Sequence, residues 1–497
     1  MSIDICPSEI IESIVELLEK DDVLNLRLCN RALAALAAGD TFRSYFDTYT
    51  LHLNLEAVRS FIRFTECQTL APFLKNLVLV GEIVDTHFLD DVIRRKGYTE
   101  YTPYGTRRSI LHPCTPAELE VLKKTQDALH ALEKEQHERD HALTWPRVTL
   151  NWTDSMSKVL AEAFESLKKY RKSYALSLEL ALLRRDAIRG ERPLPRSREE
   201  DPWDQETAPE IASKILHICI ASLAQSRLPV HSLNAFYGLP YCHSPCRDLH
   251  DIAKHEEGLR AAFKSLSSLS ISLCARILSE NESYEVEEDE DPGFAKKTLL
   301  NDEGNFAGFP VFLSFMPLLE SLRIHWYTVE RSQPRRFLDH LSASAYNLPL
   351  LRSCTLDGVC FRQATLSTFL HNFPIKRLTM VGVQLIHSRN HGWPSMTWAD
   401  TFKDLTREDS SLEYLFLDEL YHSNALIFFN ETSAADRTYP CEIMEDGVGA
   451  NTLVRCGMEQ IRGLPIEYTV PRTRRTVKHA CSEWYQNRWQ KYGYEQS

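Results

Sequence analysis

Apolar residues recur along the middle of the chain in one short motif, Leu-x-x-Leu-x-Leu or a close variant of it. An apolar, helix-like segment precedes each copy. Alternate residues of a strand face the same side, so the last two apolar positions of each motif predict one buried face. The six copies are Val230–Ala235, Leu266–Ile271, Leu319–Ile324, Leu351–Leu356, Ile375–Met380 and Leu412–Leu417.

A single strand and a single helix cannot bury their apolar faces alone, which favours a stack of strand–helix units with a shared core. This alternation resembles leucine-rich repeats, whose regular spacing is about 20 to 29 residues. Here the fourth motif positions lie between 24 and 53 residues apart, which predicts irregular repeats with inserted loops. The alternative is a generic α/β domain whose strands begin with leucine. Two earlier segments, Leu74–Leu79 and Leu176–Leu180, have similar strand patterns, although a continuous helix also fits the second.

Residues that alternate with the buried leucines are expected on the opposite, concave face of the sheet. Most are polar, and the two phenylalanines among them are expected to act as exposed anchors for a target. The alternative is that loops or a C-terminal helix cover this face. The predicted face comprises Asn234, Phe236, Ser270, Ser272, Arg323, His325, Thr355, Asp357, Thr379, Val381, Phe416 and Asp418. The candidate target-binding residues among them are Phe236, Arg323, His325, Asp357, Phe416 and Asp418.

The N-terminal forty residues predict three short helices with more apolar surface than so small a unit can bury. Pro7 suits a first helical position, and Asp21 or Asp22 can cap the second helix. Either the rest of the chain or another protein must cover the apolar stripe. The sequence reads PSEIIESIVELL at 7–18 and DVLNLRLCNR at 22–31.

These two runs resemble an F-box, particularly as it occurs in the large F-box families of filamentous fungi. The family usually has Leu-Pro where this chain has Cys6-Pro7, and often has Trp at the position of Ala32. The resemblance implies docking onto the Skp adaptor of a cullin–RING ubiquitin ligase, with the repeat domain holding a protein target. The adaptor-binding residues that it implies are Pro7, Ile10, Ile11, Ile14, Leu17, Leu18, Leu24, Leu28 and Cys29.

The predicted fold is therefore α/β. It comprises a three-helix F-box at 1–45, an irregular leucine-rich-repeat-like solenoid at 46–430 and a C-terminal capping region at 431–497. Exposed insertions are expected at about 95–115, 189–210 and 280–305. Thr115 and Glu118 form a capping-box pattern that predicts a helix start. The basic, aromatic segment Thr473–Tyr492 is expected to form a helix that covers the open end of the repeats.

Composition narrows the function classes. The chain is 43% hydrophobic and 25% charged, with a net charge of −12, which argues against general nucleic-acid binding. The acidic segment Glu280–Asp291 predicts a solvated loop, or a site for a basic partner. No membrane span or signal peptide is expected. Thirteen scattered cysteines, including Cys29, Cys219 and Cys274, favour reduced, buried thiols in a cytoplasmic or nuclear protein.

No motif for phosphate, dinucleotide or hydrolytic chemistry is present, so no catalytic residue and no cofactor are expected. Two alternatives to a ligase subunit remain open: an interaction scaffold that joins no ligase, and a zinc-dependent enzyme. The second depends on four potential ligands in a C-x3-C-x3-H-x4-H spacing. Incidental cysteines in a loop are the simpler interpretation of this set, and no metal site is assigned. The four residues are Cys242, Cys246, His250 and His255.

Overall fold

A computed structural model of the 497-residue chain provides the structure. It describes residues 8–18, 20–29, 31–36, 40–84, 93–101, 109–124, 126–127, 149–170, 176–186, 190–193, 204–239, 242–252, 255–274, 305–326, 340–341, 348–361, 363–385, 398–422, 425–430 and 451–470.

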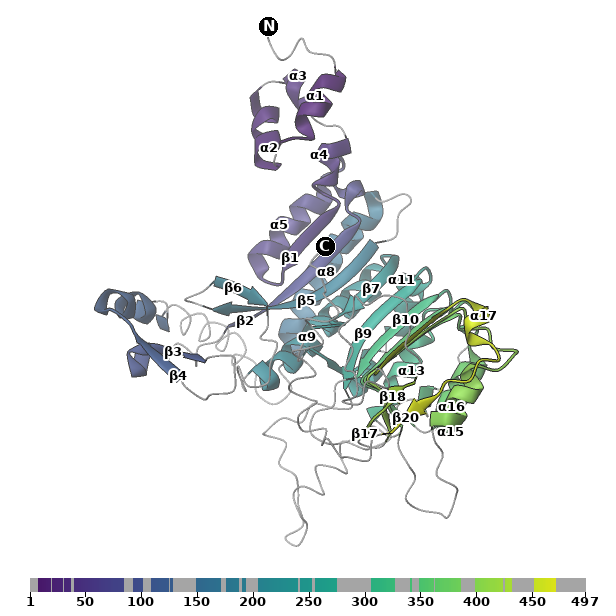
Figure 1. Cartoon of the computed structure of the whole chain (residues 1–497). Helices are drawn as coiled ribbons and strands as arrows, with labels where there is room; N and C mark the ends of the chain where they lie inside the picture. Colours follow the sequence, from purple (N-terminus) through teal and green to yellow (C-terminus); the bar gives the residue numbers. More distant parts are fainter. Residues whose placement is uncertain are drawn as a thin grey trace.

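A twelve-stranded sheet forms the centre of the molecule (Figure 1). Ten of its strands lie side by side in the order in which they occur in the sequence. Neighbours in this order pair in parallel, except at the last pair, which is antiparallel. The ten strands are β1 (Thr48–His52), β2 (Asn76–Val84), β5 (Leu176–Asp186), β7 (Val230–Ala235), β9 (Ser268–Cys274), β10 (Ser321–Trp326), β11 (Ser353–Asp357), β13 (Arg377–Val381), β15 (Tyr414–Asp418) and β19 (Thr452–Cys456).

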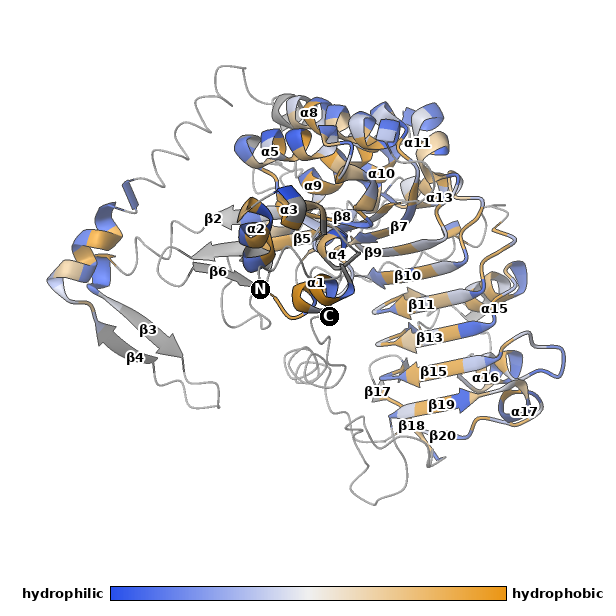
Figure 2. Ribbon diagram, turned by 90° about the horizontal axis from the view of Figure 1, so that it is seen from above, coloured by the Kyte–Doolittle hydropathy of each residue, from blue (hydrophilic) through white to orange (hydrophobic). Residues whose placement is uncertain are grey.

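Helices between the strands run along one side of this curved row of strands (Figure 2). Parallel strands need crossover connections, and the described crossover helices all lie on this one side of the sheet. One continuous apolar core fills the space between the strands and the helices. The helices are α5 (Leu55–Glu66), α8 (Thr149–Tyr170), α9 (Asp204–Ser226), α10 (Cys246–Ile252), α11 (Glu256–Phe263), α13 (Gly308–Leu313), α15 (Gln363–Asn372), α16 (Trp398–Leu405) and α17 (Met458–Ile461).

The predicted strand register is confirmed across the sheet. The fourth motif positions lie directly opposite one another on neighbouring strands, and all are buried. The same line continues through β5 and β2, so the segment 176–180 is a strand and not part of a helix. The aligned residues are Leu77, Leu178, Leu233, Leu269, Leu322, Cys354, Leu378 and Leu415.

Several short strands accompany the main sheet. Three of them pair in parallel just beyond the ends of β11, β13 and β15, and form a second, four-stranded sheet with β17. Gly358 and Gly382 make the turns into two of these strands with φ of +66° and +61°, a conformation that glycine adopts without strain. The short strands are β6 (Gly190–Pro193), β8 (Ser244–Pro245), β12 (Cys360–Phe361), β14 (Gln384–Leu385), β16 (Tyr421–His422), β17 (Ala425–Leu426), β18 (Phe428–Phe429) and β20 (Tyr468–Thr469).

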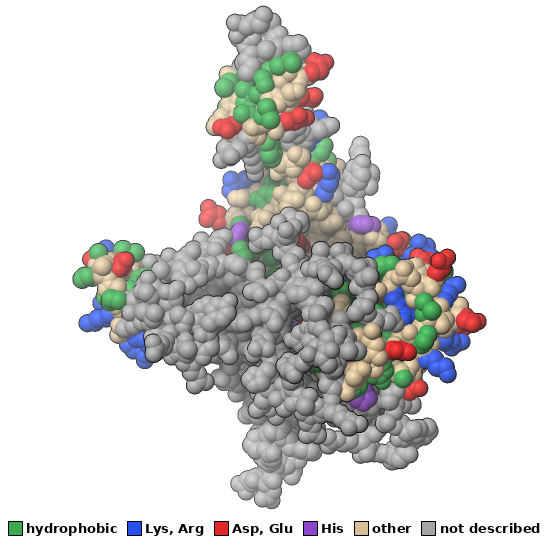
Figure 3. Space-filling view, in the orientation of Figure 1, with side chains coloured by type: hydrophobic (Ala, Val, Ile, Leu, Met, Phe, Trp, Pro, Cys, Tyr) green, Lys and Arg blue, Asp and Glu red, His purple; other side chains and the backbone are tan. Residues whose placement is uncertain are grey.

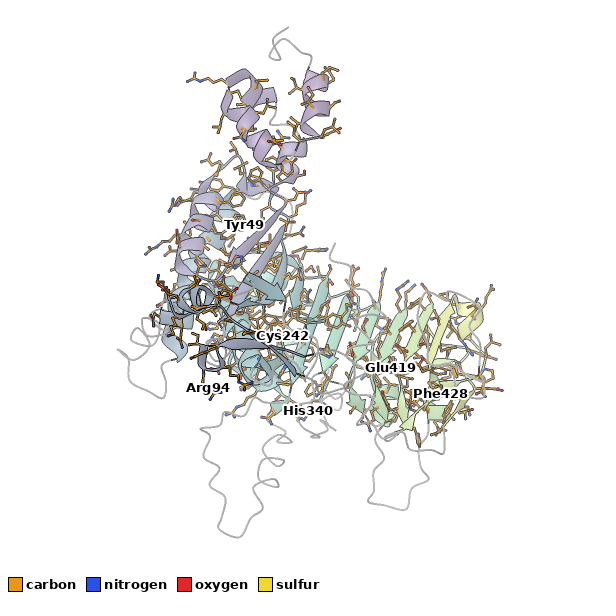
Figure 4. All side chains as sticks on the ribbon, turned by 60° about the vertical axis from the view of Figure 1, so that its left-hand side comes forward. Tyr49, Arg94, Cys242, His340, Glu419 and Phe428 are labelled. Carbon is orange, nitrogen blue, oxygen red and sulfur yellow. The ribbon has the colours of Figure 1, made fainter. Side chains whose placement is uncertain are left out.

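The N-terminal segment forms four short helices, one more than the sequence predicts. They are α1 (Ser8–Val15), α2 (Lys20–Cys29), α3 (Arg31–Leu36) and α4 (Asp40–Ser44). We call α1–α4 the helical module. The module stands at the β1 end of the sheet and projects away from it (Figure 1). Tyr49 of β1 and Phe428 of β18 lie toward opposite ends of the main body (Figure 4).

Two predicted insertions contain regular structure. The segment 95–115 holds an antiparallel hairpin of β3 (Gly97–Tyr101) and β4 (Ser109–Pro113), consistent with the strand preference of its tyrosines and threonines. The segment 189–210 contains β6, which pairs with β5, and the start of α9. Both segments therefore contain strands, and their role as exposed insertions stays a prediction. The third insertion, apart from residue 305, lies outside the described residues.

Two further predictions concern a helix start and a C-terminal helix. The capping box is confirmed, since the amide of Thr115 donates to Glu118 Oε2 at 2.7 Å and a helix covers 116–124. The C-terminal helix predicted at Thr473–Tyr492 lies outside the described residues. At the edge of the sheet formed by the last parallel strand, β15, the strand β19 pairs with it in the antiparallel direction. No helix in the described part of the chain has both the length and the apolar character needed to cross a membrane.

Candidate binding surfaces

The helical module has its own small core, separate from the core beneath the sheet. Its buried members are Ile11, Val15, Val23, Leu33 and Phe42. Phe42 belongs to α4, so the unpredicted fourth helix completes this core. The guanidinium carbon of Arg27 lies 3.7 Å from the centre of the Phe42 ring, which covers the core on one side. The module therefore needs little of the main body to bury its interior.

Large apolar side chains remain exposed on this module. Ile10 is 50% exposed, Leu17 is 88% exposed and Leu28 is 82% exposed. They are half of the six large hydrophobic residues found exposed in the described part of the chain, although the module is a small fraction of it. In Figure 3, hydrophobic side chains gather on the module with acidic side chains around them. Such a concentration of exposed apolar surface is typical of a protein interface.

The residues that the F-box resemblance assigns to adaptor binding differ in their exposure. Ile10, Leu17, Leu28 and Cys29 are exposed, and Ile14 and Leu18 are partly buried. Ile11 is fully buried in the module core, and we therefore remove it from the candidate face. Buried and exposed residues alternate along α1 because residues one helical turn apart share a face. The apolar stripe of α1 therefore has an inner side, in the module core, and an outer side. Pro7 and the side chain of Leu24 lie outside the described residues.

The module is attached to the main body through the segment that leads into β1. The hydroxyl of Tyr45 donates to the carbonyl of Leu18 at 2.8 Å. The Phe46 ring stacks against Phe64 of α5 at 6.2 Å between centres, and Lys75 forms a 2.6 Å ion pair with Asp47. These contacts fix the end of the module nearest the sheet.

The face of the sheet opposite the crossover helices carries side chains in rows that run across the strands. Five successive strands present serine at the same register position, followed by Arg377 and Tyr414. We call this the first row: Ser177, Ser232, Ser268, Ser321, Ser353, Arg377 and Tyr414. The second row, two residues further along each strand, is Glu179, Asn234, Ser270, Arg323, Thr355, Thr379 and Phe416.

The third row is Ser272, His325, Asp357, Val381 and Asp418. All five residues are buried, so the prediction that this row is exposed is wrong. The candidate target-binding residues His325, Asp357 and Asp418 belong to this row. His325 Nδ1 lies 3.1 Å from the hydroxyl of Ser272, and Thr452 of β19 donates to Asp418 at 2.7 Å. Polar contacts along the face hold these side chains, and their exposure is too small for direct contact with a target.

Neither phenylalanine is the exposed anchor that the alternation predicts. Phe236 is fully buried in the main core. Its φ of +61° interrupts the alternation at the end of β7. Phe416 is 8% exposed and lies opposite Val454 on the added strand β19. A strand that pairs at the edge of a sheet brings its side chains against those of its neighbour.

Two arginines on this face are stacked on tyrosines. The guanidinium carbon of Arg323 lies 4.5 Å from the centre of the Tyr237 ring, and that of Arg377 lies 4.4 Å from Tyr414. Arg323 was among the candidate residues, and it is partly exposed. Arg377, Tyr414 and Tyr237 are not among the residues predicted from the sequence. Arg377 and Tyr414 belong to the first row. This row corresponds to the third position of each motif, where the motif specifies no residue type.

An acidic group lies in the second row on β5. Glu179 is close to Asn234, whose side-chain amide donates to Oε1 at 3.5 Å. Burial raises the pKa of the Glu179 carboxyl above its ordinary value. Asn234 Oδ1 also accepts from the amide of Tyr237 at 3.1 Å, which holds the backbone of the tyrosine that stacks on Arg323.

The four potential zinc ligands do not form a site. All four fall within the described residues, where no group of three or more His, Cys, Asp or Glu side chains is arranged to hold a metal. Cys242 and Cys246 are buried, whereas His250 is exposed on α10. Burial raises the pKa of the Cys246 thiol well above its ordinary value, with a further contribution from Asp248. A neutral thiol is a poor metal ligand.

Thiol reactivity should separate the cysteines by burial. None of the ten described cysteines forms a disulfide, and Cys29, predicted to be buried, is exposed together with Cys456. Burial raises the pKa of Cys219, Cys354 and Cys360 to about 12. Relative to an ordinary value near 9, this lowers their thiolate fraction at pH 8 by about a thousandfold.

Brief alkylation with iodoacetamide at pH 8, followed by peptide mass mapping, should therefore label Cys29 and Cys456 and spare Cys219, Cys354 and Cys360. Alkylation after unfolding in guanidinium chloride provides the control, since all five thiols should then react. Equal labelling in the native protein would contradict the burial of these thiols.

The chain is thus an α/β protein with a large, mostly parallel sheet and a helical module that has its own core. A comparison with protein-family models finds no match, and neither does a search of curated proteins.

Proposed function

We propose that the chain is the substrate-recognition subunit of a Skp–cullin–F-box ubiquitin ligase. In this proposal the helical module is an F-box that binds the Skp adaptor, and the sheet with its helices is an irregular leucine-rich-repeat-like domain that binds a protein target. The subunit performs no bond chemistry. It raises the effective concentration of a target near the ubiquitin-charged enzyme.

The observation that carries the proposal is the exposure of Ile10, Leu17 and Leu28 on a module that has its own core. Fully burying an aliphatic side chain is worth about 1.5–3 kcal/mol. Three such residues therefore supply several kcal/mol to an interface, enough to act as its central anchors. A module that merely capped the sheet would be expected to turn these residues inward.

The arrangement of the two parts supports the same proposal. The module projects from the β1 end of the sheet, so its exposed residues lie apart from the rows of polar side chains (Figure 1). The sheet has sequential parallel strands, one shared register and helices on one side, as in stacked strand–helix repeats. One chain can then hold the adaptor and a target at the same time.

The direct test is binding of the purified full-length chain to a fungal Skp adaptor, measured by isothermal titration calorimetry. We expect a 1:1 complex with a dissociation constant below about 1 μM. An established F-box protein that binds the same adaptor preparation serves as the positive control. Absence of binding by this chain, where the control binds, would leave the interaction-scaffold alternative and remove the ligase proposal.

A further inference from the structure

Arg323 and Arg377 are each stacked on a tyrosine ring on the face of the sheet opposite the helices, and neither forms an ion pair with an acidic side chain in the described part of the chain. Arg227, Arg260, Lys376 and Arg407 each form an ion pair with a nearby glutamate or aspartate, at 2.5 to 2.8 Å. Within the described part of the chain, the side chains of Arg323 and Arg377 have the tyrosine rings as their only polar or aromatic contacts. Stacking fixes a guanidinium plane and leaves its N–H groups available at the edge.

The two arginines lie on the same face and two strands apart. Arg323 is in the second row on β10, and Arg377 is in the first row on β13, with β11 between them (Figure 2). With about 4.8 Å between strands and about 3.3 Å per residue, their Cα atoms are about 12 Å apart. An extended peptide spans a similar distance, about 13 Å, between residues four positions apart on one side.

Small hydroxyl side chains occupy the positions around the arginines. Ser353 and Thr355 lie on the strand between them, with Ser321 beside Ser353 and Thr379 beside Thr355. All four are partly exposed, and their hydroxyls form no hydrogen bond within the part of the chain that the structure describes. Each hydroxyl can donate to an oxygen anion, and the small side chains let a peptide backbone approach the sheet.

The described acidic groups near this surface form no ion pair with the two arginines. Asp357 and Asp418 are buried in the third row, and Glu179 lies three strands from Arg323. At the strand starts, Glu413 is paired with Lys376, and Glu320 is exposed next to Ser321. Two guanidinium groups without an ion-pair partner among the described residues thus form a local cationic site in a chain of net charge −12.

We propose that this surface binds an extended, anionic segment of a target protein that carries two acidic groups about four residues apart. Arginine forks bind carboxylate and phosphate oxygens in a bidentate manner, and the serine and threonine hydroxyls add donors between them. The anionic groups are phosphorylated side chains or clustered aspartate and glutamate. The inference deepens the proposed function, because it names the chemical class of the target.

The test is fluorescence polarisation with the full-length chain and no adaptor. The probe is a labelled ten-residue peptide of alanine and glycine with phosphoserine at its third and seventh positions. Companion peptides carry glutamate or unmodified serine at these positions. We expect the phosphorylated or the glutamate peptide to bind at least tenfold more tightly than the serine peptide, and their ratio tells which anion is preferred.

Substitution of each arginine tests whether these two side chains bind the anionic peptide. Arg323→Ala and Arg377→Ala should each weaken binding of the anionic peptide by about tenfold, and Arg→Lys variants should recover only part of it, since lysine lacks the fork. Arg247→Ala, on the exposed surface of α10, is the matched control and should bind like the wild type. Circular dichroism checks that each variant is folded.

Equal binding of all three peptides, or anionic binding that both alanine variants retain, would overturn the inference. So would displacement by single-stranded oligothymidylate at a lower concentration than by unlabelled phosphopeptide, which would indicate a nucleic-acid surface. Because the adaptor is absent, failure here is distinct from failure of the ligase proposal, which depends on calorimetry with the adaptor.

Discussion

Replacing Leu17 and Leu28 together with aspartate is expected to abolish binding to the Skp adaptor while the protein stays folded. The two side chains are 88% and 82% exposed, so their removal costs the free chain almost no buried apolar area. In an interface with the adaptor, each would have to desolvate a carboxylate against apolar surface, which is strongly unfavourable. We expect a loss of affinity of at least a hundredfold, measured by isothermal titration calorimetry.

The matched control is Leu318→Asp, because Leu318 is 46% exposed on the main body, away from the module. It makes the same leucine-to-aspartate change at one site, adding one negative charge where the double variant adds two, and it should bind the adaptor like the wild type. Thermal unfolding of both variants should lie within about 2 °C of the wild type, as is usual for surface substitutions. Retained affinity in the double variant would mean that Leu17, in the turn after α1, and Leu28 of α2 are not part of the docking face.

A contrasting variant, Ile11→Asp, separates stability from binding. Ile11 lies in the same apolar stripe but is fully buried in the module core. A charge there should unfold the module, so that loss of adaptor binding is accompanied by loss of helical signal. The difference between positions 11 and 17 is thus a test of how the module is packed.

Replacing Gly258 with alanine is expected to destabilise the protein by about 1–3 kcal/mol, although alanine is the better helix former. Gly258 lies in α11 against the backbone of α9. A Cβ atom built on Gly258 would lie 2.1 Å from the carbonyl oxygen of Ala224, well inside the distance that real Cβ atoms keep. Because the obstacle is backbone, α11 would have to move away from α9 and lose packing along its buried face.

Urea unfolding followed by circular dichroism measures this effect. Glu257→Ala in the same helix is the control, since it removes an exposed ion pair with Arg227 and should change the free energy of unfolding by less than about 1 kcal/mol. In an isolated exposed helix, glycine to alanine stabilises by about 1 kcal/mol, so the sign of the change is diagnostic. A stabilised Gly258→Ala variant would show that α9 and α11 are not in close backbone contact.

Local pattern was sufficient to predict the six strands that carry the leucine motif and their register. Each motif has two leucine-like residues that must face a core, and strand geometry then fixes the direction of their neighbours. The buried line from Leu233 to Leu415 follows from this rule alone. The capping box at Thr115 follows for the same reason, because its hydrogen bonds join residues three positions apart.

The accessible part of the concave face could not be predicted in this way. Alternation gives the side of the sheet on which a residue lies, and it does not give what lies above that residue. Phe416 is covered where β19 returns to the sheet, and the positive φ of Phe236 sends its side chain into the core. The partners of Arg323 and Arg377 come from strand ends and neighbouring strands, so no local spacing indicates them.

The sequence by itself determined the six motif strands, the leucine-like positions that face the core, and that the N-terminal helices carry excess apolar surface. These properties depend on contacts within a few residues, where backbone geometry is fixed. The tertiary structure decided that Ile11 is buried while Leu17 is exposed, that Gly258 must be glycine, and that two arginines face outward without acidic partners in the described chain. Each of these outcomes depends on atoms far away in the sequence, because packing and charge compensation are properties of the assembled fold.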